Sequence, residues 1–337
     1  MPAESAAQEK VWMAFPVEGY SLGDTAAARD EARSTWAAVA HAIAEFEPVT
    51  MIVDPGEIGP AREYLSSGIE IVEAPLNDAW ARDIGPTFVL DGNGNLGAVD
   101  WVFNGWGAAE WARWDKDQHI GKLIAELSGA ELIDSPMINE GGGIQVDGAG
   151  SVLLTESVQL GDGRNSTWTK ADVEAELART IGADRSIWLP YGLTRDNEKF
   201  GTRGHVDIVA AMPSPGVVLV HDQTDPDHPD FDVSKQIKAI IAAAEPDWEI
   251  IGVPAPTVLT DDEGPVDHSY INHLVVNGGV IACSFNDPQD DKALQILAEA
   301  YPGRRIVAID ARELFARGGG IHCITQQQPA ASQKVVS

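Results

Sequence analysis

The chain has 337 residues, 44% of them hydrophobic, and its 52 acidic against 23 basic side chains give a formal charge of −29 at pH 7. This length exceeds what one ordinary core holds, so either two domains or a repeated architecture is expected. The charge argues against nucleic acid and anionic membranes as partners, although simple solubility also explains it.

The two cysteines, Cys283 and Cys323, cannot form a disulfide framework, and the zinc-type Cys/His spacings are absent. The acidic N-terminus lacks the apolar run of a signal peptide, and no run of apolar residues is long enough to span a membrane. A soluble cytoplasmic protein is therefore expected. Cys283 lies in an apolar stretch and is expected to be part of the core.

Helical periodicity recurs along the chain, and each helix-like stretch is followed by a short apolar strand that ends at a turn. The strands read VTMIVDP, AELIDSP, SIWLP, EIIGVP and RIVAID. The helices are predicted at residues 25–46, 117–127, 170–181, 234–244 and 290–300.

Strand pairs complete these units. Hairpins are predicted in TFVLDGNGNLGAVDWVF, IQVDGAGSVLLT, VDIVAAMPSPGVVLV and INHLVVNGGVIACSF. The fifth unit lacks a hairpin, and GIHCIT near the C-terminus together with VWMAF near the N-terminus would supply it, which would close a ring. We therefore predict a single five-bladed α/β propeller domain over residues 1–330 and a disordered tail at 331–337. A doubly wound parallel sheet is the competing fold, but the hairpins favour antiparallel pairing.

In a ring of repeats, the segments that lead into the hairpins can converge on one centre. The unusual residues lie in those segments: Trp80 and Asp83 in NDAWARDIGP, Glu140 in INEGGGIQVD, and His205 and Asp207 in GTRGHVDIV. GPVDHSYIN carries Asp267 and His268, and RGGGIHCITQQQP carries Cys323. His205 and Asp207 are two residues apart and would lie on one face of a strand.

A cysteine with a histidine indicates covalent catalysis, in which a thiolate attacks and an imidazole moves protons. Crowded carboxylates would oppose the negative charge that develops in acyl transfer, but they suit a cationic reacting centre. A guanidinium is such a centre, because it is planar, strongly cationic and shaped for paired hydrogen bonds to carboxylates. Loss of ammonia followed by attack of water would convert it to a ureido group.

At these residues the chain resembles the agmatine deiminases, within the guanidine-modifying (pentein) superfamily that also contains the bacterial-type peptidylarginine deiminases. The resemblance runs from EKVWMAFP through NDAWARDIGPTF, WVFNGWG, NEGGGIQVDGAGSVLLTE and GHVD to GGGIHCITQQQP. It implies a five-bladed α/β propeller, no metal or organic cofactor, and hydrolysis of agmatine, a small cationic guanidine, to N-carbamoylputrescine and ammonia. A homodimer is expected at the level of the family only.

The resemblance also implies roles for single residues. Cys323 would be the nucleophile that forms an amidino intermediate, and His205 would protonate the departing ammonia and then activate water. Asp83 and Asp207 would hold the guanidinium nitrogens, and Glu140 would lie beside the imidazole or the substrate. Trp80 would form a wall of the pocket, and Trp106 and Gly319 are further candidates for substrate binding, although core packing also explains most tryptophans.

Arg203 departs from the family pattern, which usually has a small polar or acidic residue before the glycine of GHVD. If its guanidinium faces the pocket, it would repel the ammonium of agmatine and favour a carboxylate, so that arginine, a guanidino acid or a peptidylarginine becomes the alternative substrate. If it points outward, it would pair with a surface acid and agmatine would remain the substrate.

The same residues allow different interpretations. Asp83 could be the ion-pair partner of Arg82, and attack by an amine in place of water would give amidino transfer. His205, Asp207, His221, Asp222 and His228 could be read as metal ligands of a metallohydrolase, but that reading leaves Cys323 unused. A non-catalytic binding module would not need both Cys323 and His205.

Overall fold

The computed structural model describes residues 1–198, 200–262 and 264–332. Strands in this part of the chain form five sheets of three or four strands and one two-stranded sheet, β13 (Thr260–Asp261) with β14 (Gly264–Pro265). The four-stranded sheet has its strands in the spatial order β18 (Thr325–Pro329), β1 (Gln8–Ala14), β2 (Val49–Val53) and β3 (Glu70–Glu73). Two three-stranded sheets have the orders β4 (Thr87–Leu90), β5 (Leu96–Val102), β6 (Glu131–Ile138) and β7 (Ile144–Val146), β8 (Ser151–Thr155), β9 (Arg185–Leu189). The other two have the orders β10 (Ala210–Ser214), β11 (Val217–Asp222), β12 (Glu249–Pro254) and β15 (Leu274–Val276), β16 (Gly279–Ser284), β17 (Arg305–Asp310).

Each of the five larger sheets repeats one pattern. Its first two strands are antiparallel, and the third runs parallel to the second. Because a parallel partner requires a crossover, a helix lies between the second and third strands. These helices are α1 (Ala26–Ala44), α5 (Ile120–Ser128), α7 (Lys170–Ile181), α8 (Asp230–Ala244) and α9 (Asp290–Ala300). The shorter helices are α2 (Ile58–Tyr64), α3 (Ala81–Ile84), α4 (Gly105–Ala108), α6 (Glu156–Gln159) and α10 (Arg312–Phe315).

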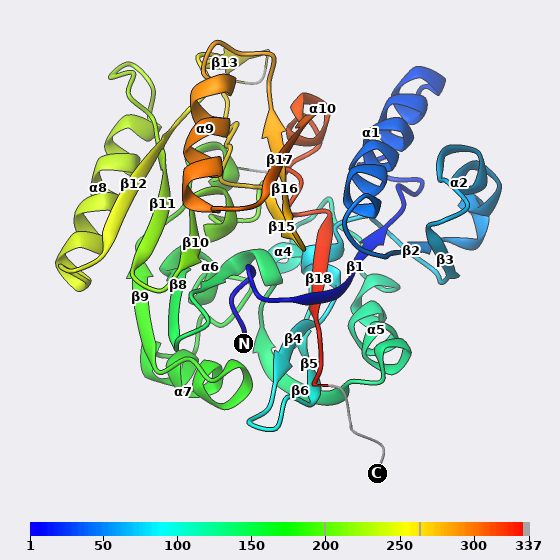
Figure 1. Cartoon of the computed structure of the whole chain (residues 1–337), viewed down its shortest axis with the longest axis horizontal. Helices are drawn as coiled ribbons and strands as arrows, with labels where there is room; N and C mark the ends of the chain where they lie inside the picture. Colours follow the sequence, from blue (N-terminus) through cyan, green and yellow to red (C-terminus); the bar gives the residue numbers. More distant parts are fainter. Residues whose placement is uncertain (199, 263, 333–337) are drawn as a thin grey trace.

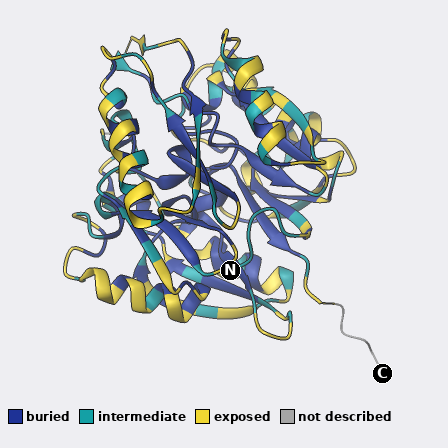
Figure 2. Ribbon diagram, turned by 60° about the vertical axis from the view of Figure 1, so that its left-hand side comes forward, coloured by how far each residue is buried: buried dark blue, intermediate teal, exposed yellow. Residues whose placement is uncertain are grey.

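The sheets follow one another about a common centre, with the long helices on the outside (Figure 1). Three of these helices also contact the last crossover strand of the preceding sheet: α7 contacts β6, α8 contacts β9 and α9 contacts β12. Helix α1 contacts β17 in the same way, so the first unit packs against the last. The strands are mostly buried and the outer helix faces are exposed (Figure 2).

The two chain ends pair, as predicted, but the C-terminal partner strand is Thr325–Pro329 and not the predicted GIHCIT. Strand β1 is antiparallel to β18, and the indole of Trp12 donates to Gln328 Oε1 at 2.9 Å. The chain is therefore a mixed α/β protein, as predicted, in which one of the five sheets is assembled from both ends of the sequence.

Local sequence explains the helix boundaries. Helix α7 matches its predicted range because Thr169 and Asp172 form a capping box and Gly182 ends the helix in the left-handed region, with a φ of 71°. Helix α8 begins four residues earlier than predicted, at Asp230, because Pro229 precedes it and Asp230 and Asp232 occupy its first turn.

Two predicted strands are wrong. GIHCIT is a turn, since the amides of His322 and Cys323 donate to Asn272 and the Cys323 carbonyl accepts from Arg82 in place of a sheet ladder. The stretch Val206–Ile208 is a 3₁₀ turn, so His205 and Asp207 do not lie on a strand, and β10 begins at Ala210.

The remaining expectations on organisation concern the core and the tail. Cys283 is fully buried in β16, as predicted. In the predicted tail, the amide of Ser332 donates to the Gly94 carbonyl at 2.9 Å, while residues 333–337 lie outside the described residues. Across the described ranges, no helix has the length and apolar character needed to cross a membrane.

Candidate active site

Cys323 lies in the turn that leads into β18, and its side chain is buried. Its Sγ is 3.4 Å from Asp207 Oδ2 and accepts a hydrogen bond from Asn272 Nδ2 at 3.2 Å. The Asn272 side-chain oxygen also accepts from the Cys323 amide at 3.3 Å, so one asparagine holds both the backbone and the sulfur. The thiol is therefore fixed in position beside a carboxylate.

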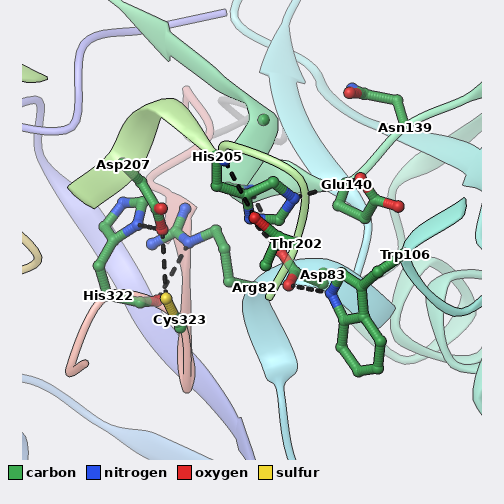
Figure 3. A network of polar contacts seen from close by, with 12 residues as sticks. Arg82, Asp83, Trp106, Asn139, Glu140, Thr202, His205, Asp207, His322 and Cys323 are labelled. Atoms are coloured by element: carbon green, nitrogen blue, oxygen red, sulfur yellow. Dashed lines mark hydrogen bonds and ion pairs between the residues drawn. The ribbon is translucent and has the colours of Figure 1, made fainter. Parts of the chain in front are cut away.

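Asp83 and Asp207 reach this region from two different turns. Asp83, in α3, accepts from the Trp106 indole at 2.8 Å and from the Gly142 amide at 3.2 Å. Asp207 Oδ2 accepts from His322 Nδ1 at 2.8 Å, whereas its Oδ1 is buried and has no hydrogen-bond partner (Figure 3). An unpartnered buried carboxylate oxygen next to a thiol is suited to a ligand that donates hydrogen bonds.

His205 lies between the carboxylates (Figure 3). Its Nε2 is 3.2 Å from Glu140 Oε2, and its Nδ1, 3.9 Å from Asp83 Oδ1, is buried without a hydrogen-bond partner. Arg164 Nε donates to both oxygens of Glu140 at 3.0 Å, and its Nη2 donates to the Thr202 carbonyl at 2.7 Å. Of the two predicted places for Glu140, the structure thus shows the one beside the imidazole.

The carboxylates set the charges of the site. Burial by itself would lower the pKa of His205, but Asp83, Glu140 and Asp207 together raise it to about 9. Burial, opposed by His205 and reinforced by Glu140 and Asp207, raises the pKa of Asp83 to about 6. Burial, followed by the charges of Asp207 and Asp83, raises the pKa of the Cys323 thiol well above its usual value. The site thus stabilises a positive charge. It disfavours the Cys323 thiolate unless a cationic ligand binds beside it.

At Glu140 and Asp207, neighbouring cations lower the carboxyl pKa by more than burial raises it. Burial favours the neutral form of Glu140, but Arg164 and His205 hold the pKa of this carboxyl below its ordinary value. His322 and His205 do the same for the pKa of Asp207, also against burial. Glu140 and Asp207 are therefore ionised at neutral pH.

A small cavity opens onto the thiol. Trp80, Asp83, Trp106 and Cys323 lie among its walls, and its remaining lining residues are Trp111, Phe200, Gly201, Thr202, Arg317 and Gly318. The rings of Trp106 and Trp111 stack with centroids 5.3 Å apart. Such flat apolar walls with polar groups at one end suit a ligand that has a planar charged head.

The other predicted substrate-binding residues divide into two groups. Gly319 lies against the site: a Cβ there would come within 2.9 Å of the Trp80 ring and 3.0 Å of Cys323 Sγ. Arg203 does not line the cavity; it is exposed and adopts a left-handed backbone with a φ of 79°. The structure therefore brings Trp80, Trp106 and Gly319 to Cys323 but not Arg203.

Residues that the sequence did not predict complete the site. His322 and Asn272 contact Asp207 and Cys323, Arg164 pairs with Glu140, and Glu4 reaches His322 from the N-terminal end of the chain. Arg82 is not turned toward Asp83; it donates to Gln327 Oε1 at 2.6 Å and lies 3.8 Å from Glu4. His322 lies within the motif GGGIHCIT and Asn272 within SYIN, so these motifs could have indicated both residues. No sequence pattern connects Glu4 or Arg164 with the site.

Asp267, His268 and His221 are not among the residues that line the cavity at the thiol. His268 stacks on Phe285, and Asp267 lines a neighbouring hollow. His221 Nδ1 is 3.1 Å from Ser269 Oγ. Across the part of the chain that the structure describes, no cluster of three or more His, Cys, Asp or Glu side chains has the arrangement of a metal site.

Comparisons with known proteins agree with this geometry. The family model of the Porphyromonas-type peptidyl-arginine deiminases matches residues 1–329. A Streptomyces coelicolor relative is 52% identical over 334 residues, 98% of each chain. The agmatine deiminase of Stutzerimonas stutzeri is 38% identical over 357 residues, which cover 98% of this chain and 95% of that one.

The fold comparison points the same way. The solved structure of the Enterococcus faecalis agmatine deiminase superposes with a TM-score of 0.90 at 30% identity, covering 98% of this chain and 95% of that one. The class that the fold and the site define is thus that of the guanidine-modifying α/β enzymes. The chain belongs to the Porphyromonas-type peptidyl-arginine deiminase family.

Proposed function

We propose that this protein is an agmatine deiminase, which hydrolyses agmatine to N-carbamoylputrescine and ammonia. The observation that carries the proposal is the buried Cys323 thiol beside Asp207, with Asp207 Oδ1 and His205 Nδ1 both unpartnered. A guanidinium would supply the hydrogen-bond donors and the positive charge that these groups lack. The family and the names of the relatives support agmatine as the guanidine.

In the first half of the proposed reaction, Asp83 and Asp207 hold the guanidinium nitrogens. The positive charge of the substrate offsets these carboxylates and lowers the pKa of the Cys323 thiol, which then releases its proton to solvent. The thiolate attacks the guanidinium carbon and forms a C–S bond. Protonated His205 gives its proton to the departing nitrogen, the C–N bond breaks, and ammonia leaves.

In the second half, His205 is neutral and takes a proton from water as the water attacks the amidino carbon. The tetrahedral intermediate then collapses: the C–S bond breaks, and the proton of its hydroxyl group passes to the departing sulfur, which restores the Cys323 thiol and releases the ureido product. Glu140 orients the imidazole through Nε2 and stabilises its protonated form, and Arg164 keeps Glu140 ionised for that task.

The substrate is tested by ammonia release from agmatine, arginine, 4-guanidinobutyrate and a peptide with a terminal arginine. This panel varies only what lies beyond the guanidine. Preference for agmatine is expected because Arg203 is exposed and does not line the cavity. Preference for a carboxylate-bearing guanidine would overturn the proposal, and a product formed only when an amine is added would indicate amidino transfer.

The nucleophile is tested by Cys323→Ala with Cys283→Ala as the matched control. Cys323→Ala should lose turnover and still bind agmatine in calorimetry, because the carboxylates that hold the guanidinium remain. Cys283 is buried in β16, so its replacement should change stability more than turnover. Unchanged turnover in Cys323→Ala would contradict the mechanism.

The composition supports a small cationic guanidine as the partner and argues against nucleic acid. We also propose that the protein is cytoplasmic and that it forms a homodimer. Gel filtration with light scattering would test the homodimer.

A further inference from the structure

The first seven residues of the chain, termed here the N-terminal segment, lie near the middle of the molecule in the view of Figure 1. Its anchors lie in or directly beside strands of several different sheets. Ser5 Oγ donates to the Pro213 carbonyl at 3.1 Å, Arg304 Nη2 donates to the Ser5 carbonyl at 2.6 Å, and the Ala330 amide donates to the Ala7 carbonyl at 2.9 Å. The segment is therefore fixed at the point where the repeated units meet.

This placement directs the carboxylate of Glu4 inward. Glu4 Oε1 is 2.8 Å from His322 Nε2, 3.4 Å from Gln145 Nε2 and 3.8 Å from Arg82 Nη1. Only 12% of the Glu4 side chain is exposed. A largely buried carboxylate with several donors around it is held in one orientation.

His322 connects Glu4 to the reacting groups. Its Nε2 faces Glu4, and its Nδ1 is 2.8 Å from Asp207 Oδ2. A carboxylate oxygen can only accept, so both ring nitrogens must carry a proton and His322 must be an imidazolium. Asp207 Oδ2 is in turn 3.4 Å from Cys323 Sγ, so a continuous line of contacts joins Glu4 to the nucleophile.

The charged groups around His322 favour this state. Burial and Arg82 lower the pKa of His322, but Glu4 and Asp207 outweigh them and the pKa is raised. Glu4 itself is buried, which opposes its charge, yet His322, Arg82 and His273 lower its pKa to about 2. The His322 imidazolium bridges Glu4 and Asp207 Oδ2, which fixes the position of Asp207. Asp207 Oδ1 stays without a hydrogen-bond partner.

We propose that Glu4 is a positioning residue of the active site: through His322 it fixes Asp207 in the orientation that receives the guanidinium. The inference rests on the proposed function and adds to it a residue that comes from the N-terminal segment and does not touch the substrate. It gives the N-terminal segment, which is anchored where the repeated units meet, a role in substrate binding.

The test compares Glu4→Gln with two controls in the full chain. Glu9→Gln removes the same charge from an exposed position of the next strand, and Ser5→Ala removes an anchor of the segment without changing Glu4. In Glu4→Gln, KM for agmatine should rise about tenfold or more while kcat changes less, because a charge-assisted hydrogen bond to His322 is lost and Asp207 is less well placed. Both controls should keep KM near that of the unchanged protein.

A second measurement does not depend on activity. In protein with isotope-labelled histidine, NMR of the His322 ring, assigned with His322→Gln, should show an imidazolium at neutral pH, and Glu4→Gln should move its titration to lower pH. A neutral His322 in the unchanged protein would overturn the proposal, and so would an equal rise in KM in Ser5→Ala and Glu4→Gln. If the unchanged protein releases no ammonia from agmatine, the proposed function fails, while the NMR titration still decides the role of Glu4.

Discussion

Single side chains set the working pH range of this site. In the proposed mechanism, guanidinium binding requires ionised Asp83, whose pKa is about 6, and the departing ammonia requires protonated His205, whose pKa is about 9. We therefore expect kcat/KM to rise with pH through about 6, as Asp83 loses its proton, and to fall through about 9, as His205 loses its own.

Trp106→Phe tests the acidic limb of this profile. The indole donates to Asp83 Oδ2 and favours the ionised carboxylate, so its removal should raise the pKa of Asp83 and move the acidic limb to higher pH. The alkaline limb should stay in place. Trp188→Phe, which removes an indole donor to Glu174 elsewhere, is the control and should leave both limbs unchanged. An unmoved acidic limb in Trp106→Phe would show that Asp83 is not the group that titrates.

Asn272→Ala tests how the thiolate is stabilised. The Asn272 amide donates to Cys323 Sγ and opposes burial and the two carboxylates, which raise the pKa of the thiol. Its loss should raise that pKa further and slow alkylation of Cys323 by iodoacetamide about tenfold, the usual effect of one hydrogen bond to a charged group. Cys323→Ala gives the background rate. If Asn272→Ala and the unchanged protein were alkylated at equal rates across the pH range, this role for Asn272 would be contradicted.

At the scale of elements, the active site is assembled from turns. Asp83 lies in the single-turn helix α3, Asp207 lies in the 3₁₀ turn at Val206–Ile208, and Gly142 is the middle residue of a 3₁₀ turn at Gly141–Gly143. Turns allow the backbone to come within reach of side chains from other units, which a regular strand would keep at a distance.

Gly142→Ala tests the closeness of this assembly. A Cβ at this position would lie 2.5 Å from His205 Nδ1 and 3.1 Å from Asp207 Oδ2, so both side chains would have to move. We expect kcat/KM to fall by about 100-fold, the typical cost of displacing catalytic groups by about 1 Å, with the thermal transition little changed. Gly59→Ala, where a Cβ meets nothing within 4 Å, is the control. Full activity in Gly142→Ala would mean that the site tolerates such a displacement.

At the scale of the whole molecule, the formal charge of −29 creates a field that attracts cations. A wide hollow that shares Trp106 and Trp111 with the active-site cavity is lined by six acids against two cations. The acids are Glu18, Asp24, Asp54, Glu57, Asp78 and Asp115, and the cations are Arg113 and Lys116. Salt shortens the reach of this field from about 30 Å at 0.01 M to about 3 Å at 1 M. The approach of a doubly charged substrate should therefore depend on ionic strength.

We accordingly expect kcat/KM for agmatine to decrease as salt is added. The control substrate is 4-guanidinobutyrate, which has no net charge, and its slower turnover should depend less on salt. Steady-state rates in a series of sodium chloride concentrations measure both. The same salt dependence for the two substrates would show that the field does not assist binding.

The sequence by itself determined the features that depend on neighbouring residues. Periodicity predicted α7 and α9 with their observed limits, and the hairpin turns predicted the antiparallel pairs, because amphipathic spacing and capping act over a few residues. The motifs around Asp83, His205 and Cys323 also predicted residues that do meet in one place.

Only the tertiary structure decided which groups surround the reacting atoms. Glu4 and His322 are 318 positions apart, and Arg164 and Glu140 are buried together although no sequence pattern pairs them. The two predicted strands that are wrong fail for the same cause: the backbone at His322–Cys323 is held by Asn272 and that at Gly204–His205 by Asp196. Hydrogen bonds to side chains outside the predicted strands outweighed local strand preference there: Asn272 lies 51 positions from Cys323, and Asp196 lies nine positions from His205. A buried polar group must find a partner wherever the fold supplies one.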